Sequence, residues 1–177
     1  TLAYGLARAL MRAGRLDEAE ARLQPLRGKP AGTVWVEGLA AEIRLARKDA
    51  AGAIRILEAA QKQSPSSRSV SYALADARIL GGRADAAAAE LRQRIDNRSG
   101  DPRLWQLLSR AYAALGKRTE QHRTQAEVYY LRGSLPAAIE QLEIARRAND
   151  GDFYTLSAVD ARLRELKQRL LEEKRER

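Results

Sequence analysis

A repeat of 34 residues constrains the fold of this chain more than any other feature of its sequence. The segments GRLDEAEARL at 14–23, KDAAGAIRIL at 48–57 and GRADAAAAEL at 82–91 align without gaps at that spacing. The equivalent positions are Ala19, Ala53 and Ala87, then Leu23, Leu57 and Leu91, and also Ala7, Ala41, Ala75 and Ser109. Small residues at facing positions let antiparallel helices approach closely, and the leucine four residues later fills the seam. The repeat therefore predicts stacked helical hairpins.

The turns of these hairpins are predicted at Gly14, Gly82 and Gly116, because glycine readily takes the left-handed conformation that ends a helix. Lys48 stands at the equivalent position of the second hairpin. Gly133 follows Gly116 by only 17 residues, which is half a step. We therefore expect the helix near 119–131 to close one pair and to open the next.

The pattern predicts an all-α chain of about ten antiparallel helices, without strand signals. The expected helices are 2–13, 16–27, 32–47, 50–63, 67–80, 84–98, 103–115, 118–132, 135–148 and 153–175. We interpret them as a single domain with units at about 1–33, 34–67, 68–101 and 102–132, a half-unit at 133–150 and a capping helix at 152–176.

The last helix departs from the repeat and has the pattern of a cap. Gly151 and Asp152 supply a break and an N-cap. One face is apolar, with Leu156, Val159, Leu163, Leu166 and Leu170 at helical spacing, and the other face is charged. A terminal repeat needs such a helix, because its last apolar edge must be covered while the outer face meets water.

Charge and composition narrow the function. The 177 residues carry a net charge of +9 but contain no cysteine, which excludes disulfides and thiol chemistry. The basic residues are mixed with acidic ones, and Arg162 has Glu165 at pairing distance along its helix, so specific nucleic-acid recognition is disfavoured. Weak contact with an anionic membrane surface stays open. No long apolar run or export signal occurs, and the helical pattern begins by Leu2, so we expect a fragment of a longer protein.

Catalytic motifs are missing from the sequence. His122 is the single histidine and has no ligand pattern around it, so we interpret it as a partly exposed helix residue. We find no phosphate-binding loop, dinucleotide fingerprint or hydrolase elbow. The chain itself is therefore predicted not to be an enzyme and to hold no cofactor or metal.

The segment LWQLLSRAYAALGK at 104–117 resembles the tetratricopeptide repeat, in which tryptophan, leucine, a small residue, tyrosine and glycine recur at set offsets. Arg44 and Arg78 depart from that pattern, because they stand where an aromatic residue is usual. The resemblance implies a right-handed superhelix whose first helices line the inner surface. It also implies that Trp105 is buried, whereas Trp35 fits either a seam between units or the binding surface.

Transferring the inward positions of the related repeats gives a candidate surface for binding an extended or partly folded polypeptide. The residues are Tyr4, Arg8, Met11, Trp35, Glu42, Tyr72, Asp76, Arg103, Gln106 and Arg110, with Leu45 and Ile79 completing the rows.

A narrower resemblance is carried by GSLPAAIEQLEIARRANDGDFYTLSAVDARLRELKQRL at 133–170, by YGLARALMRAGRLDEAEARLQPL at 4–26 and by LAAEIRLARKDAAGAI at 39–54. These segments are similar to the C-terminal repeat domain of the β-barrel assembly-enhancing protease family. The resemblance implies a periplasmic zinc metalloprotease whose HExxH domain lies upstream and holds the zinc. It also implies partners among outer-membrane protein precursors, the barrel-assembly machinery and the chain's own protease domain. The alternative is a tetratricopeptide scaffold or adaptor that is unrelated to a protease and assembles a multiprotein complex.

Overall fold

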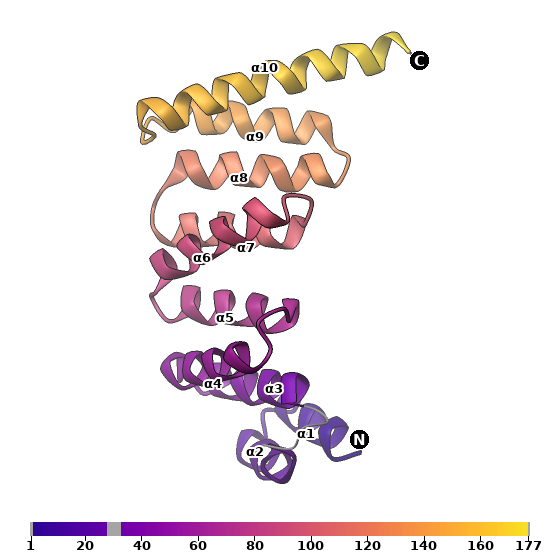
Figure 1. The fold of residues 1–177 in the computed structure, drawn as a ribbon, viewed down its shortest axis with the longest axis vertical. Coiled ribbons are helices and arrows are strands. Elements are labelled where there is room, and N and C mark those ends of the chain that lie inside the picture. Colours follow the sequence, from indigo (N-terminus) through magenta and orange to yellow (C-terminus); the bar gives the residue numbers. More distant parts are fainter. Residues whose placement is uncertain (1, 28–32, 177) are drawn as a thin grey trace. The chain divides into compact units, whose positions relative to one another are not determined.

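The computed structural model describes residues 2–27 and 33–176, and in that part of the chain every regular element is a helix (Figure 1). The α-helices are α1 (Leu2–Arg12), α2 (Leu16–Leu23), α3 (Thr33–Ala46), α4 (Ala50–Gln63), α5 (Arg68–Leu80), α6 (Ala84–Asn97), α7 (Pro102–Ala114), α8 (Arg118–Leu131), α9 (Leu135–Arg147) and α10 (Phe153–Arg175). The predicted all-α class is confirmed.

The end predicted for the helix over 16–27 is wrong. The α-helix stops at Leu23 and continues as a short 3-10 turn, η1 (Gln24–Leu26). Pro25 causes this change, because it lacks the N–H that an α-helix needs and its ring crowds the preceding turn.

The chain forms two compact units, Thr1–Gly81 and Gly82–Arg177. The boundary falls inside the unit predicted at 68–101, between its two adjacent glycines. In the first unit each helix from α1 to α5 packs on the next, and α3 also lies beside both α1 and α5. In the second unit each helix from α6 to α10 packs on the next, and α10 also reaches α8.

The predicted repeat positions form the cores of both units. Those fully or almost fully buried are Ala7, Ala19, Leu23, Ala41, Ala53, Leu57, Ala87 and Leu91. One cluster joins α1, α2 and α3 around Leu10, Leu23 and Leu39, and a second joins α3, α4 and α5 around Leu57 and Leu74. In the second unit, a cluster around Leu142, Val159 and Leu166 joins α8, α9 and α10. The apolar face predicted for the last helix is therefore the face that packs on the repeat.

The hairpin turns use the left-handed backbone as predicted. Gly14, Gly82, Gly116 and Gly133 have φ values between 70° and 79°. Lys48 takes the same conformation with φ 62°, although a side chain makes it less favourable there. Asn149 has φ 60° and ends α9. Helix starts are capped by the side chains of Asp49, Ser67, Asp101 and Asp152.

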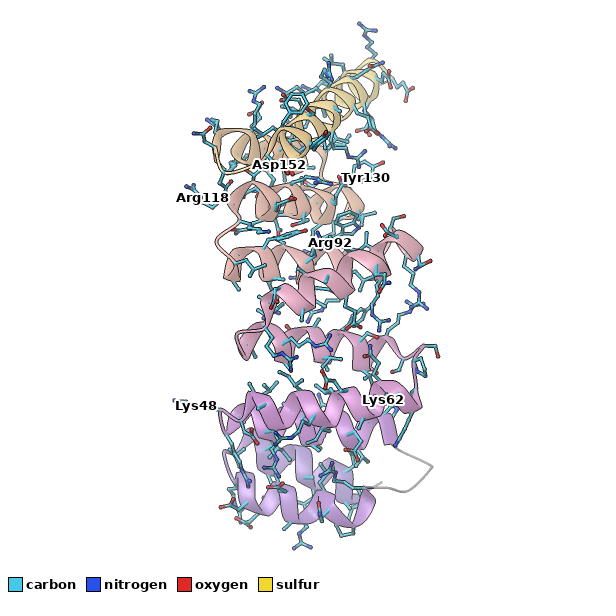
Figure 2. All side chains as sticks on the ribbon, turned by 60° about the vertical axis from the view of Figure 1, so that its left-hand side comes forward. Lys48, Lys62, Arg92, Arg118, Tyr130 and Asp152 are labelled. Carbon is cyan, nitrogen blue, oxygen red and sulfur yellow. The ribbon has the colours of Figure 1, made fainter. Side chains whose placement is uncertain are left out.

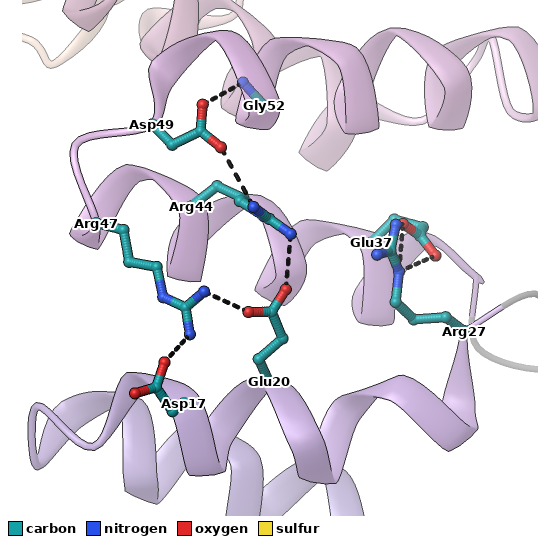
Figure 3. Close-up of polar contacts among 8 residues, drawn as sticks. All are labelled: Asp17, Glu20, Arg27, Glu37, Arg44, Arg47, Asp49 and Gly52. Atoms are coloured by element: carbon teal, nitrogen blue, oxygen red, sulfur yellow. Dashed lines mark hydrogen bonds and ion pairs between the residues drawn. The ribbon is translucent and has the colours of Figure 1, made fainter.

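Ion pairs join the helices of the first unit (Figure 3). Arg44 Nη2 lies 2.8 Å from Glu20 Oε1 of α2, and its Nη1 lies 3.4 Å from Asp49 Oδ2 at the start of α4. Arg47 Nη2 pairs with Asp17 Oδ1 at 2.6 Å, and Nη1 of the same residue contacts Glu20. The arginine that departs from the aromatic pattern at position 44 therefore connects three helices through its guanidinium.

A capping contact joins helices of the second unit instead. Asp150, in the loop after α9, accepts hydrogen bonds from Arg118 N at 2.6 Å, from Thr119 N at 2.8 Å and from the Thr119 hydroxyl. These are orphan groups at the start of α8, 31 and 32 residues away along the chain. A Cβ on Gly151 would lie 2.8 Å from Thr119 Cγ2, so glycine permits this close approach.

Candidate protein-binding surfaces

The first helices of the first unit, α1, α3 and α5, carry seven of the predicted binding residues. Trp35 on α3 is 67% exposed, which decides between the two roles left open for it. It lies on the surface and does not fill a seam between hairpins. Glu42, also on α3, is exposed as well. An exposed tryptophan with a large apolar ring is the kind of side chain that anchors protein interfaces.

The residues of α1 are more constrained than those of α3. Tyr4 and Met11 are half-buried and pack against the cluster formed by α1, α2 and α3. Arg8 Nη1 donates a hydrogen bond to the Tyr4 hydroxyl at 3.3 Å. These side chains are therefore held in place by the fold, and each presents only part of its surface to a partner.

Gly38 is a member of this face that the sequence analysis missed. It stands 34 residues after Tyr4 and 34 before Tyr72, and one turn after Trp35. A Cβ built on Gly38 would meet no heavy atom within 4 Å. The middle helix of the three thus has an open position in the row whose other members are tyrosines. The 34-residue register itself is the signal that could have identified it.

The α5 residues Tyr72 and Asp76 are half-buried, and each has an interaction within the chain. On α7, in the second unit, Arg103 Nη1 donates to Gln106 Oε1 at 3.2 Å, and Arg110 is exposed. The structure thus pairs Arg103 with Gln106, and Tyr4 with Arg8. The predicted residues of α7 belong to a different compact unit from the other seven.

A pocket of about 420 Å³ lies over α7, and it was not predicted. Trp105, Leu108 and Tyr112 of α7 line it together with Arg92, Ile95 and Asp96 of α6 and with Glu120, Arg123 and Thr124 of α8. Figure 2 labels Arg92 on its α6 wall. The first eight residues of α8, RTEQHRTQ, are all polar, and they pack against an apolar helix. That polar run is the sequence signal for a gap at this place.

Two aromatic residues of this pocket are held by specific contacts. Trp105 is half-buried and its Nε1 donates to the Ser99 carbonyl oxygen at 2.7 Å, so the expected burial of this ring is only partial. Tyr112 is buried, and its burial, assisted by Glu120, raises the pKa of its hydroxyl group. The phenol therefore stays neutral at physiological pH.

The remaining predictions concern metal chemistry and the membrane. His122 is half-buried, with Nδ1 2.9 Å from Gln141 Oε1, which agrees with a helix residue that has no ligand role. Within residues 2–27 and 33–176 no three His, Cys, Asp or Glu side chains are placed to hold a metal ion. No helix in that same part of the chain combines the length and the apolar character that crossing a bilayer requires.

Comparison with known proteins gives a family, sequence relatives and structural neighbours. The tetratricopeptide repeat model matches residues 44–111. The β-barrel assembly-enhancing protease of Escherichia coli K12 is 34% identical over 165 residues, and that of Yersinia pestis is 32% identical over 164 residues. These alignments cover 93% of this chain and 34% of each relative, so the chain spans about a third of their length.

Solved structures match the fold alone. MamA from Desulfovibrio magneticus RS-1 has a TM-score of 0.64 and 15% identity, covering 94% of each chain. A thermophilic TPR protein of Thermus thermophilus has a TM-score of 0.55 and 17% identity, covering 90% of this chain and 96% of that chain.

Proposed function

We propose a protein-binding function for this chain, which belongs to the tetratricopeptide-repeat proteins and is homologous over nearly its whole length to a region of the β-barrel assembly-enhancing proteases. In this proposal it is the non-catalytic interaction domain of a periplasmic zinc metalloprotease. It recognises outer-membrane β-barrel precursors or the barrel-assembly machinery, and the zinc belongs to a protease domain outside the chain. The relatives' printed name, which refers to barrel assembly, supports the compartment and the class of partner.

One observation carries the proposal: the face formed by α1, α3 and α5 has an exposed aromatic anchor beside an open position. Trp35 is 67% exposed and Gly38 leaves space one turn further along the same helix. Apolar rings of this size contribute most of the binding energy in protein interfaces when a partner covers them. A solvent-exposed tryptophan next to an unfilled position is arranged to receive an apolar side chain.

An extended polypeptide fits this face better than a compact surface does. Successive side chains of an extended strand point to opposite sides, so every second residue can enter a row of open positions. Glu42 is exposed beside the apolar positions and can accept hydrogen bonds from a partner's backbone or cations. Strand-forming segments of an unfolded barrel protein supply both the alternating apolar side chains and the unpaired backbone groups.

A substitution that fills the open position gives the sharpest test. Gly38→Leu adds bulk at a site where a Cβ meets nothing, and leucine favours a helix more than glycine does, so the fold is preserved. We expect this variant and Trp35→Ala to weaken capture of a urea-unfolded outer-membrane barrel protein, diluted into buffer. Loss of an anchor of about 2 kcal/mol corresponds to roughly thirtyfold in affinity.

Matched controls come from the same unit. Gly5→Leu makes the same change in α1, at another glycine whose Cβ would meet no atom. Leu80→Ala removes another exposed apolar side chain. Both should bind like the wild type. Equal affinities for Gly38→Leu and Gly5→Leu would contradict the assignment of this face.

The predicted polar members of the surface are tested separately. Alanine or charge substitutions at Tyr72, Arg103 and Arg110 are expected to weaken capture without lowering helicity. A photo-crosslinker at position 35, followed by identification of the captured protein in cells, distinguishes a barrel precursor or assembly factor from the components of an unrelated complex. The latter result would favour the scaffold alternative.

A further inference from the structure

The outer stripe of α10 is a surface that the proposed function leaves unused. Its residues follow each other at steps of three and four, which places them along one side of a helix: Phe153, Ser157, Asp160, Arg164, Lys167 and Leu171. The four middle residues line a groove of about 460 Å³ that is completed by Arg146 of α9 and by Leu163. The stripe from Phe153 to Leu171 is about 27 Å long at the rise of an α-helix.

Cations exceed carboxylates along this groove. Arg146, Arg164 and Lys167 line it, and Arg147 lies close enough to Glu143 to lower the pKa of that carboxyl group together with Lys167. Two carboxylates offset them in part: Lys167 Nζ lies 2.7 Å from Glu143 Oε1, and Arg146 Nη1 lies 3.9 Å from Asp160 Oδ1. The surplus positive charge favours an anionic partner.

Apolar side chains stand at both ends of the same stripe. Phe153 is 78% exposed and Leu171 is 58% exposed, although burial of such side chains is normally favourable. Tyr154, beside Phe153, is also exposed, and the two rings meet edge to face with centroids 5.9 Å apart. Aromatic and aliphatic side chains that alternate with cations are typical of helices lying at a membrane interface.

The acidic residues of α10 lie mostly on another side. Glu165, Glu172, Glu173 and Glu176 surround a separate hollow of about 610 Å³, together with Gln168 and Arg169. Arg162 and Arg169 are directed elsewhere, since their guanidinium carbons lie 4.4 Å and 5.5 Å from the centre of the Tyr130 ring. The helix therefore separates its charges, and an anionic surface can approach the basic stripe without meeting most of its carboxylates.

We propose that this stripe docks the protein on the surface of an anionic phospholipid bilayer. In this arrangement α10 lies along the membrane, Phe153 and Leu171 enter the interfacial region, and Arg146, Arg164 and Lys167 contact lipid phosphates. The helix binds peripherally and does not span the bilayer. The site is independent of the α1, α3 and α5 face, so either assignment can fail without the other.

The test measures cosedimentation of the 177-residue chain with phosphatidylglycerol vesicles and with phosphatidylcholine vesicles. We expect binding to the anionic vesicles alone, and weaker binding as salt is raised. Arg164→Glu should reduce the partition coefficient by roughly fivefold or more, the effect of one basic residue near a charged membrane. Phe153→Ser should reduce it by a similar factor.

Two control variants distinguish this stripe from general attraction. Arg98→Glu makes the same charge change at an exposed position at the end of α6, and Leu80→Ser removes an exposed apolar residue elsewhere. Both should bind vesicles like the wild type, and unchanged circular dichroism should verify the fold of each variant. An equal loss in Arg98→Glu and Arg164→Glu would overturn the proposal.

Other outcomes count against the membrane in distinct ways. A chain that ignores both kinds of vesicle but binds polyglutamate would assign the stripe to an acidic protein. Undiminished binding by Phe153→Ser would overturn insertion of the apolar ends.

Discussion

The two units fill one equivalent repeat position in different ways. Positions 44 and 78 in the first unit are arginines, and position 112 in the second is tyrosine. Arg44 pairs with Glu20 and Arg78 with Glu58, each on a neighbouring helix, with nitrogen to oxygen distances of 2.8 Å and 3.0 Å. Tyr112 is buried instead and forms part of a pocket. The same helix packing thus tolerates an aromatic ring or a guanidinium, provided that a carboxylate stands opposite the latter.

The largest effect is expected from removing the ring. Tyr112→Ala leaves a cavity at a buried position and should lower the free energy of unfolding by about 3 kcal/mol, whereas Arg78→Ala, which breaks a partly exposed ion pair, should cost about 1 kcal/mol or less. Urea titration followed by circular dichroism measures both. Added salt should diminish the cost of Arg78→Ala alone. Equal costs at both positions would remove the distinction between the units.

The next effect concerns the contact that connects α8 to the loop after α9. Asp150→Ala removes acceptors from two backbone N–H groups and from Thr119, which is 1% exposed, so we expect a loss of about 1–2 kcal/mol. Amide hydrogen exchange should show faster opening at the start of α8. Asp49→Ala is the matched control in the first unit, because Asp49 caps only its own helix. Slow exchange at Thr119 in the Asp150 variant would refute the coupling.

A smaller effect distinguishes the turns. Lys48→Gly relieves a left-handed residue with a side chain and should stabilise the first unit by about 0.5–1 kcal/mol. Gly116→Ala introduces a side chain at φ 70° in the second unit and should destabilise it by about 1 kcal/mol. Thermal unfolding of the two variants measures these opposite signs, and shifts in the same direction would contradict a common turn geometry.

The smallest effect is a dependence on pH. The hydrogen bond from the Thr119 side chain, followed by backbone hydrogen bonds, holds the pKa of Asp150 below its usual value. Because the folded pKa is lowered, this contribution is complete above about pH 4, the ordinary range of an aspartate, and is lost as pH falls through the folded value. Asp150→Asn should remove this part of the acid sensitivity. An unchanged acid transition in that variant would exclude Asp150 as its source.

Most of the fold was predictable because it repeats. The alanines, leucines and glycines at the 34-residue step determined the helices, their buried faces and their turns. The relation to barrel assembly-enhancing proteases, suggested by the segments at 4–26, 39–54 and 133–170, is confirmed by the alignment over 93% of the chain. Periodicity reports what each residue shares with its equivalents, and that is what these features depend on.

The features that sequence did not predict depend on single contacts between distant residues. The Asp150 contact joins residues 31 and 32 positions apart, and no local pattern distinguishes Asp150 from an ordinary loop aspartate. The two tryptophans also differ from simple expectation, since Trp35 is exposed and Trp105 is only half-buried. Both outcomes follow from what lies opposite each ring, which the register alone does not contain.

The turn residues with positive φ divide the chain into interchangeable modules. They stand at 14, 48, 82 and 116, at intervals of 34, and the next is Gly133 after 17. A segment cut between any two of the first four begins and ends with the same backbone geometry, so a genetic duplication or deletion of that length can lengthen or shorten the domain by a whole hairpin. Beyond Gly116 the interval halves, and the segment that follows is a fixed terminus. Variation in length among related domains is therefore expected before residue 116 and not after it.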